Sequence, residues 1–324
     1  MNSISPYPLQ FEPLIKQTIW GGNRLGTLLG KGIGEEGNYA ESWEIVDHGE
    51  DQSVVTNGPL AGQTLSNLMS QHGPWLMGDA AHDGFPLLLK YLDCNRVLSV
   101  QVHPDDAYGA TMEVPDLGKT EAWYVVAAEP DSLIYAGLKA GVDRAALSEA
   151  MAAGETDSVL HSFHPDPGDC VFIPAGTVHA LGAGLVIAEI QQSSNTTFRL
   201  FDWNRVGADG NPRPLHIEQS LEVSDYDSGP VQARKSDSNA EGWQNLIRCE
   251  KFRLRTLESG EDTIGGDGEF HVLTVPTGEV TLETDAETVA LSRGQSTLLP
   301  ASMGECRVRL APESTLLAAD PGRE

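Results

Sequence analysis

The sequence contains few cysteines, few basic residues and no long apolar run. No stretch approaches the roughly 18 consecutive apolar residues of a membrane span, and the first residues lack the charged and apolar regions of a signal peptide. The four cysteines, Cys94, Cys170, Cys249 and Cys306, lie far apart without a C-x-x-C pair. This spacing argues against a thiolate metal site or a disulfide framework. We therefore expect a cytoplasmic protein without membrane association.

Basic residues are outnumbered by acidic residues, 21 to 47, which gives a net charge of −26 over 324 residues. Such a surface repels nucleic acids and anionic membranes, so neither is an expected partner. The simplest interpretation of the acidity is solubility. An anionic small substrate would be repelled as well, and its site would need a local cluster of lysine and arginine.

Glycine and proline are abundant, with 34 and 19 copies, and they separate many short apolar runs such as VLSVQVH and DCVFIPA. This pattern predicts a mainly β protein built as a sandwich or barrel. The length suits two domains. Residues 224–242 are polar and aperiodic, which indicates an exposed linker. We predict one domain over residues 1–235 and a smaller one over residues 236–324.

Helical patterns are few. Three segments, 62–73, 142–154 and 214–223, have the spacing of short helices. In the second of them, Asp143 is a plausible N-cap and Gly154 a plausible stop.

Two segments of the chain resemble each other weakly. PGDCVFIPAGTVH (167–179) and RGQSTLLPASMGE (293–305) both read Gly, five residues, Pro, Ala. The similarity indicates either two related β-barrels or a chance recurrence of a Gly-strand-Pro pattern. If the copies are related, only the first keeps a terminal histidine, because Glu305 stands at the position of His179.

A short stretch, SVQVHPDD (99–106), alternates polar and apolar residues. In a strand, Ser99, Gln101 and His103 would share one face and two valines the other. The polar face could line solvent or a polar barrel interior. The preceding run LLL (87–89) is typical of a strand that is buried on both faces, which favours the interior.

Three later segments place further polar residues on strand faces. Lys119, Glu121 and Trp123 alternate, and Glu121 could face His103 across neighbouring strands. His179 begins a strand after a glycine turn. Glu189 shares a face with Gln191 in the next strand, and Arg199 shares one with Phe201 in the strand after that.

Gln101, His103, Glu121 and His179 together offer two imidazoles, a carboxylate and an amide oxygen. This donor set suits Zn²⁺, and also Fe²⁺, Mn²⁺ or Co²⁺. It contains no cysteine, so a closed structural zinc site is disfavoured. Mixed nitrogen and oxygen ligation that leaves room for water is typical of catalytic metal sites.

The spacing from Gly168 through Pro174 and Gly176 to His179 matches the second cupin motif, although Ala183 stands where that motif has asparagine. A segment similar to the first cupin motif is also present, in an altered form. It reads Gln101-x-His103 in place of the usual H-x-H, and its glutamate, Glu121, lies further along the chain. In this form the chain resembles the type I phosphomannose isomerases, and most closely their short bacterial branch. The segments that carry the resemblance, which extends to about residue 225, are 15–25, 39–48, 87–106, 118–124 and 176–205.

The resemblance implies a double-stranded β-helix, the cupin jelly roll, followed by a degenerate cupin-like β domain without metal. It implies that one zinc ion per chain is held by Gln101, His103, Glu121 and His179. The implied catalytic residues are Arg199 and Glu189, and the residues implied to lie near the substrate are Lys90, Ser99 and Lys119.

The implied reaction interconverts mannose 6-phosphate and fructose 6-phosphate through a cis-enediol. Such a reaction needs stabilisation of the enediolate and a base that moves a carbon-bound proton. Glu189 or a metal-bound hydroxide is the expected base. Arg199, Lys90 and Lys119 are the expected phosphate cations. A small sugar phosphate is the expected partner, for a monomer or a homodimer.

Two other functions remain open at this stage. A cupin iron dioxygenase would share the barrel and the metal, but would have no general need for three cations at the cavity. A sugar-phosphate-binding cupin without activity would keep the cations and lack turnover. An assay on mannose 6-phosphate separates these possibilities.

Overall fold

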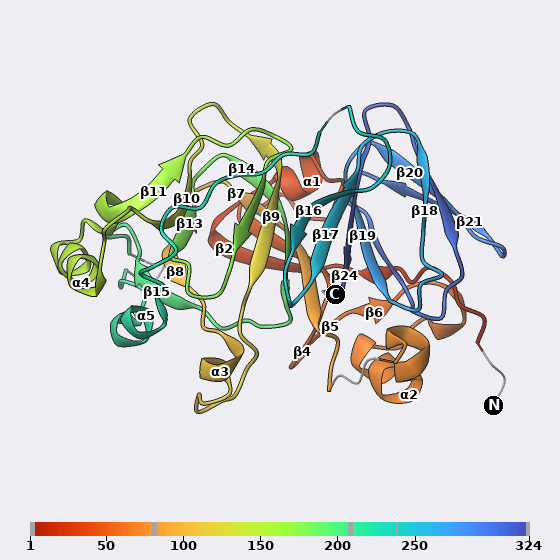
Figure 1. The fold of residues 1–324 in the computed structure, drawn as a ribbon, viewed down its shortest axis with the longest axis horizontal. Coiled ribbons are helices and arrows are strands. Elements are labelled where there is room, and N and C mark those ends of the chain that lie inside the picture. The colour runs from red at the N-terminus through yellow and green to blue at the C-terminus, as the bar shows by residue number, and fades with distance from the viewer. Residues whose placement is uncertain (1–3, 80–82, 207–209, 238, 322–324) are drawn as a thin grey trace.

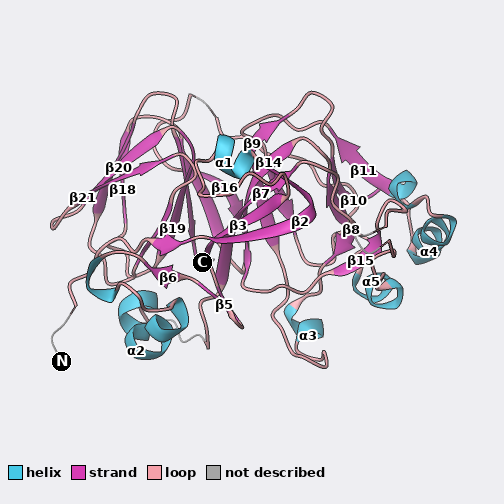
Figure 2. Cartoon of the chain, turned by 180° about the vertical axis from the view of Figure 1, so that it is seen from behind, coloured by secondary structure: helices cyan, strands magenta, loops and turns pink. Residues whose placement is uncertain are grey.

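The computed structural model describes residues 4–79, 83–206, 210–237 and 239–321. Two antiparallel β structures, each made of two packed sheets, lie side by side (Figure 1). We call them the first barrel (residues 14–201) and the second barrel (residues 244–320). The longer helices lie at the edges of the molecule (Figure 2). The mainly β prediction is confirmed, and no helix among the described residues is long and apolar enough to cross a membrane.

The first barrel consists of a six-stranded and a five-stranded sheet. In spatial order, the six-stranded sheet contains β12 (Cys170–Ile173), β9 (Glu121–Ala128), β14 (Leu185–Gln192), β7 (Leu87–Cys94), β3 (Tyr39–Ile45) and β2 (Leu14–Gly22). The five-stranded sheet contains β11 (Leu160–Phe163), β10 (Ile134–Leu138), β13 (His179–Leu181), β8 (Val100–Val102) and β15 (Phe198–Phe201).

The second barrel consists of a five-stranded and a four-stranded sheet. The first of these contains β16 (Gln244–Arg248), β17 (Arg253–Leu257), β24 (Thr315–Asp320), β19 (His271–Thr277) and β22 (Ser296–Leu299). The other contains β18 (Glu261–Ile264), β23 (Cys306–Leu310), β20 (Glu279–Glu283) and β21 (Thr288–Ser292). Two short ladders pair β1 (Phe11–Glu12) with β6 (Val54–Val55), and β4 (Asp47–His48) with β5 (Asp51–Gln52).

The two barrels repeat one strand order. The first barrel has β12-β9-β14-β7 in one sheet and β11-β10-β13-β8 in the other. The second barrel has β22-β19-β24-β17 and β21-β20-β23-β18. Each strand from β7 to β14 therefore has a counterpart whose number is ten higher.

The weak sequence similarity lies on one pair of these counterparts, β12 and β22. Gly168 and Gly294 adopt the left-handed conformation just before the strands, with φ of 90° and 82°, which glycine tolerates without steric cost. Pro174 and Pro300 follow the strands, and each carbonyl accepts a hydrogen bond from the amide three residues later. The similarity therefore reflects a repeated structure and not a chance pattern.

The four sheets stack so that the six-stranded sheet is covered on both faces. Trp123 and Ile187 pack toward the five-stranded sheet of the first barrel. Leu89 and Ile190, on the opposite face, pack with Leu317 of the second barrel. All eight residues of β7 are buried. This confirms the prediction of a strand buried on both faces, and it shows that the second barrel covers the first.

Strand β8 confirms the predicted alternation. Val100 and Val102 pack in an apolar cluster under the helices, while Gln101 lines a cavity on the opposite face. The prediction that Arg199 and Phe201 share a face is wrong. A register shift between them in β15 leaves Phe201 opposite Val100 in the apolar cluster, while Arg199 lines the cavity. A bulge of this kind adds a residue and so reverses the alternation.

The three predicted helices are present with adjusted bounds. Helix α2 (Leu65–Met77) continues past the predicted end, because a kink at His72 lets Pro74 begin a new turn. Helix α4 (Arg144–Ala153) has the predicted caps: Asp143 accepts a hydrogen bond from the amide of Ala146, and Gly154 is left-handed. Helix α5 (Ile217–Val223) lies within its predicted segment. The remaining helices are single turns: α1 (Arg24–Thr27), α3 (Asp106–Gly109), η1 (Gly58–Leu60) and η2 (Thr156–Val159).

The predicted linker, residues 224–242, lacks regular structure in its described part but is tied to the first barrel. The amide of Val231 donates to the carbonyl of Ala136, and Arg234 exchanges both backbone hydrogen bonds with Cys170. Val231 also packs against the core between the two sheets. The segment therefore covers the edge of that core, which a free linker would leave exposed.

Candidate active site and metal centre

The two sheets of the first barrel enclose a cavity of about 310 Å³. Glu41, Lys90 and Glu189 enter it from the six-stranded sheet, and Gln101 and Arg199 enter it from the five-stranded sheet. Residues from distant segments of the sequence thus converge on one space. The side chains point inward because their strand neighbours are apolar and face the flanking cores.

Three of the four predicted metal ligands form one cluster. His103 follows β8, Glu121 is the first residue of β9, and His179 is the first residue of β13. One potential ligand atom from each lies within 4.8 Å of the others. The His179 Nε2 atom is 3.3 Å from Glu121 Oε1, and the His103 Nε2 atom is 3.6 Å from Glu121 Oε2.

Both imidazoles are oriented by the backbone. His103 Nδ1 donates to the carbonyl of Thr196 at 2.9 Å, and His179 Nδ1 donates to the carbonyl of Thr177 at 2.8 Å. A carbonyl accepts only, so each ring carries its proton on Nδ1 and presents the lone pair of Nε2 to the cluster. Burial lowers the pKa of His179 to about 3, and burial and Lys119 lower the pKa of His103 well below its usual value. Both rings are therefore neutral, as metal ligation requires.

The carboxylate between them is completely buried and lacks a full set of partners. Glu121 Oε1 and His179 Nε2 make no hydrogen bond. Burial, together with the neighbouring Glu189, raises the pKa of Glu121. A buried carboxylate of this kind is costly without a cation. Two neutral imidazoles and one carboxylate directed at each other fit a divalent metal ion.

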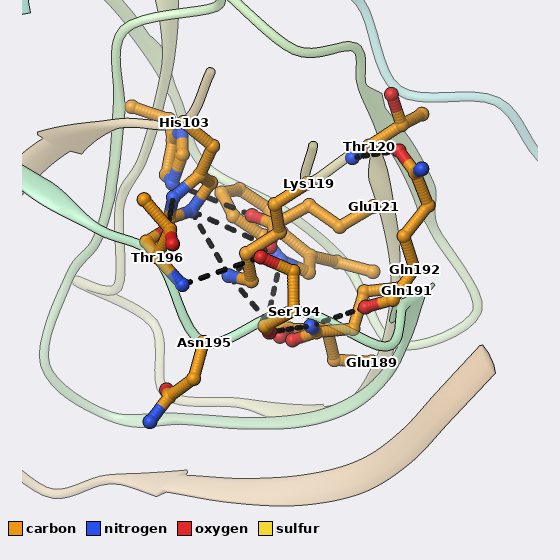
Figure 3. A network of polar contacts seen from close by, with 12 residues as sticks. His103, Lys119, Thr120, Glu121, Glu189, Gln191, Gln192, Ser194, Asn195 and Thr196 are labelled. Atoms are coloured by element: carbon orange, nitrogen blue, oxygen red, sulfur yellow. Dashed lines mark hydrogen bonds and ion pairs between the residues drawn. The ribbon is translucent and has the colours of Figure 1, made fainter. Parts of the chain in front are cut away.

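Lys119 supplies one cation to the cluster (Figure 3). Its ammonium lies 2.5 Å from Glu121 Oε2 and 2.9 Å from His103 Nε2. It therefore uses lone pairs that a metal ion would also use, and a bound metal would displace it from His103. The remaining predicted ligand, Gln101, lies in register with His179 on the adjacent strand and lines the same cavity.

Glu189 is the second buried carboxylate of the cavity. Its Oε1 atom is 2.9 Å from the Lys90 ammonium and 3.8 Å from that of Lys119, and its Oε2 atom accepts from Trp123 Nε1 at 2.9 Å. Burial opposes ionisation of Glu189, but the two ammonium groups outweigh burial and lower its pKa. Glu189 is thus an ionised carboxylate held in a fixed position by two lysines and an indole.

Lys90 also contacts a carboxylate that the sequence analysis missed. Glu41 Oε2 is 3.4 Å from the Lys90 ammonium and accepts from Trp43 Nε1 at 2.7 Å. Burial disfavours the charged form of Lys90, but Glu189 and Glu41 outweigh it and raise the pKa. The segment YAESWEI (39–45) contained a usable signal, because Glu41 and Trp43 alternate on one strand face.

Two arginines also line the cavity. Arg199 Nε donates to Ser99 Oγ at 3.3 Å, and its Nη1 donates to the carbonyl of Pro214. Arg213, which the sequence analysis also missed, lines the same cavity. It follows β15 in an irregular segment, where no periodic pattern could mark it.

A second cavity, of about 460 Å³, lies between residues 29–32 and residues 291–296. No predicted site residue lines it. Its buried charges, Lys31 and Glu44, pair with each other at 2.6 Å. The smaller cavity in the first barrel is therefore the candidate active site.

Comparison with known proteins is consistent with this geometry. Residues 9–125 match the family model of the phosphomannose isomerase type I catalytic domain. The chain is 36% identical to mannose-6-phosphate isomerase ManA of Bacillus subtilis, over 93% of this chain and 95% of that protein. This chain belongs to the type I phosphomannose isomerases. A mannose-6-phosphate isomerase of Streptococcus mutans is also 36% identical, over 90% of this chain and 92% of its own.

The family relationship extends to the fold. The crystal structure of the mannose 6-phosphate isomerase from Bacillus subtilis has a TM-score of 0.87 and 30% sequence identity to this chain. The superposition covers 96% of this chain and 99% of the other. The second barrel, for which the sequence offered only a β pattern, is therefore part of the shared family fold.

Proposed function

We propose that this chain interconverts mannose 6-phosphate and fructose 6-phosphate through a cis-enediol. One observation carries the proposal: an ionised buried carboxylate and a pair of arginines line one cavity, and Lys119, which lines it too, contacts the cluster that fits a metal ion. The relatives named above are mannose-6-phosphate isomerases. The enzyme would work in the cytoplasm as a monomer or homodimer on a small sugar phosphate.

We propose Gln101, His103, Glu121 and His179 as the ligands of one zinc ion per chain. Two neutral imidazoles with oxygen donors suit zinc, and also iron, manganese or cobalt as divalent ions. When bound, the metal supplies an electrophile that stabilises negative charge on the substrate oxygens.

Glu189 is the proposed base. Its lowered pKa keeps it ionised, as a base must be, and its contacts with Lys90 and Trp123 fix the orientation of the carboxylate. It would remove the proton from C2 of the aldose and return it to C1, while the hydroxyl proton of O2 moves to O1. Lys119, placed between the cluster and Glu189, would hold the substrate oxygens near the transferred charge.

Arg199 is proposed to act on the substrate and not on the metal. It is half-buried, lines the cavity, and is held by Ser99 and Pro214. The Arg199→Ala variant should lower kcat/KM severely and leave the metal content intact. Loss of metal from this variant would show that its role is misassigned.

A coupled assay on mannose 6-phosphate, before and after exhaustive chelation, tests the function. We expect isomerisation that disappears on chelation and returns with zinc. Full activity without metal would exclude the metal-dependent mechanism, and binding of the sugar phosphate without turnover would favour a non-catalytic cupin. Uptake of oxygen in place of isomerisation would favour an iron dioxygenase. The paired charges of Lys90 and Glu189 favour proton transfer over oxygen chemistry.

A further inference from the structure

The connection between β14 and β15, residues 193–197, carries groups of the active site although it has no regular structure. The carbonyl of Thr196 accepts the hydrogen bond from His103 Nδ1 at 2.9 Å (Figure 3), and the residues on either side of it, Asn195 and Thr197, line the cavity. The partner of one imidazole nitrogen orients the ring and therefore the lone pair of the other nitrogen. A residue that fixes this connection thus acts on the metal cluster.

One carboxylate, Asp116, holds three consecutive residues of the connection. Its Oδ2 atom accepts from Ser194 Oγ at 3.0 Å, from the amide of Asn195 at 3.2 Å and from Thr196 Oγ1 at 2.7 Å. The amide of Thr196 donates in turn to Ser194 Oγ at 3.3 Å. Side-chain oxygens thus supply the acceptors that a neighbouring strand would otherwise provide to these amides.

The other oxygen of Asp116 is anchored away from the connection. Its Oδ1 atom accepts from the amide of Leu117 at 2.8 Å and from His48 Nε2, in β4, at 3.2 Å. Burial opposes ionisation of Asp116, but hydrogen bonds from His48, Thr196 and Ser194 outweigh it and lower its pKa. Asp116 is therefore an ionised carboxylate, and hydrogen bonds to an ionised acceptor are about twice as strong as those between neutral groups.

This restraint applies to one of the two histidines of the metal cluster. His179 Nδ1 donates to the carbonyl of Thr177, whose amide donates to the carbonyl of Pro174. Neither contact involves residues 193–197. A change at Asp116 should therefore reach His103 through Thr196 and leave the orientation of His179 intact.

We propose that Asp116 is a positioning residue of the metal centre: it fixes the carbonyl of Thr196 and, through it, the direction in which His103 presents its Nε2 lone pair. This proposal rests on the proposed function, in which His103 is a metal ligand. Asp116 is not among the described residues that line the cavity, so it acts through the connection and not on the substrate.

The test compares the full-length, zinc-loaded protein with its Asp116→Asn variant, in which an amide replaces the carboxylate and one acceptor oxygen is lost. We expect the zinc dissociation constant, measured by competition with a chelator, to rise about tenfold, the lower end of the range for outer-shell partners of metal ligands, because Asp116 acts through a further residue. In NMR spectra of protein with ¹⁵N-labelled histidine, the Nδ1 proton of His103 should exchange with water faster, while that of His179 should keep its rate.

Thr196→Val is the second variant. It removes the hydroxyl that donates to Asp116 and keeps the carbonyl that holds His103, so it should produce the same selective change in a milder form. It also tests the proposal if Asp116→Asn does not fold.

Asp105→Asn is the matched control, because it makes the same chemical change in the same segment between β8 and β9. Asp105 caps α3 by accepting from the amide of Tyr108, a role that asparagine also fills. We expect its zinc dissociation constant and both exchange rates to equal those of the parent.

Three outcomes would overturn the assignment: an unchanged zinc dissociation constant in the folded Asp116→Asn variant, unchanged exchange at His103, or equal acceleration at both histidines. The last result would mean that Asp116 stabilises the barrel in general. The exchange rates do not depend on activity. A parent protein that binds zinc without isomerising the sugar phosphate, and whose variants change selectively at His103, would refute the isomerase function and leave the positioning role standing.

Discussion

His271 in the second barrel occupies the position that Glu121 occupies in the first. Each is the first residue of its strand, and each pairs with the last residue of the edge strand, Leu299 and Ile173 respectively. By the same registers, Arg255 corresponds to Lys90. The repeated fold thus holds a buried ionic cluster at equivalent places, one suited to a metal and the other closed by protein groups.

The second cluster is complete without a metal. Asp320 is fully buried and accepts from Arg253 Nε and Arg255 Nη2 at 2.9 Å each. His271 Nε2 is 3.0 Å from Asp267, and its Nδ1 is 3.4 Å from Asp320. Both ring nitrogens lie near carboxylates, which outweigh burial and favour the protonated form of His271, and in that form the ring offers no lone pair to a metal. Two arginines, together with His271 in its protonated form, therefore supply the positive charge in this cluster.

This cluster predicts a pH dependence of stability. Burial opposes the charge on His271, but Asp267 and Asp320 outweigh it and raise the pKa above 6.5. The charged His271 side chain therefore contributes its full stabilisation of the fold below about pH 6.5, and this contribution is lost as the pH rises through the folded-state pKa. The pKa of Asp267 is lowered to about 2, so its contribution is lost only as the pH falls below about 4. Urea unfolding should show a declining free energy of unfolding from pH 7 to pH 8.5, because the lowered pKa values of His103 and His179 act in the opposite direction only below about pH 6.5.

The Asp267→Asn variant is the control for that decline. Asp267 is partly exposed, so the variant should fold, and it removes one of the two carboxylates that hold the proton on His271. We expect a lower free energy of unfolding at pH 7 and a flatter profile toward pH 8.5. A profile as steep as that of the parent would assign the decline to other groups.

Much of the first barrel's site could be predicted from the sequence, because strand alternation and motif spacing act over short distances. The pattern of Ser99, Gln101 and His103 required a polar interior once the flanking run was buried. Whether Gln101 ligates a metal stays a prediction. The division at residues 235 and 236 also stays a prediction.

The remaining features depend on tertiary contacts. The bulge in β15 arises from pairing with β8, so alternation alone placed Phe201 on the wrong face. The position of the Arg213 side chain is set by its hydrogen bond to Asp202 and not by any periodic pattern. Helix α2 continues past its predicted end at Gly73 because of a kink that the residue pattern did not reveal. In each case a contact between separated segments overrode a local preference.

Glu41 should tune the reaction without touching the metal. Its carboxylate holds Lys90 against Glu189, so the Glu41→Gln variant weakens one of two restraints on that ammonium. We expect kcat to fall about tenfold, as for a hydrogen bond to a charged group worth ~1.5 kcal/mol, with unchanged metal content. Steady-state kinetics and metal analysis measure both.

Trp43→Phe provides a milder form of the same change, because it removes the hydrogen bond to Glu41 and leaves the charge. It should lower kcat less than Glu41→Gln does. If Trp43→Phe lowers kcat and Glu41→Gln does not, Glu41 has no role in positioning Lys90.

Phe85 and Phe270 should couple the stabilities of the two barrels. Their rings are 4.8 Å apart, both side chains are almost fully buried, and they precede β7 and β19. Either substitution by alanine should cost about 3–5 kcal/mol in the free energy of unfolding. The double variant should cost less than the sum by about 1 kcal/mol, because the pair shares one contact. Combining Phe85→Ala with Leu282→Ala, in the separate core of the second barrel, should give additive losses.

The first barrel should be unable to fold without the second. The outer face of β7 and β14 presents Leu89, Tyr91 and Ile190, which are buried only because the second barrel covers them. The N-terminal segment is tied in as well, since Leu9 exchanges both backbone hydrogen bonds with Leu298. A chain of residues 1–235 would expose a contiguous apolar sheet face, and such faces aggregate. We expect this fragment to be insoluble or to bind an apolar dye, and co-expression of residues 236–324 should restore solubility. A monomeric 1–235 fragment that unfolds cooperatively and binds zinc would show that the first barrel folds without the second. The repeated strand order of the second barrel would then serve something other than the stability of the first.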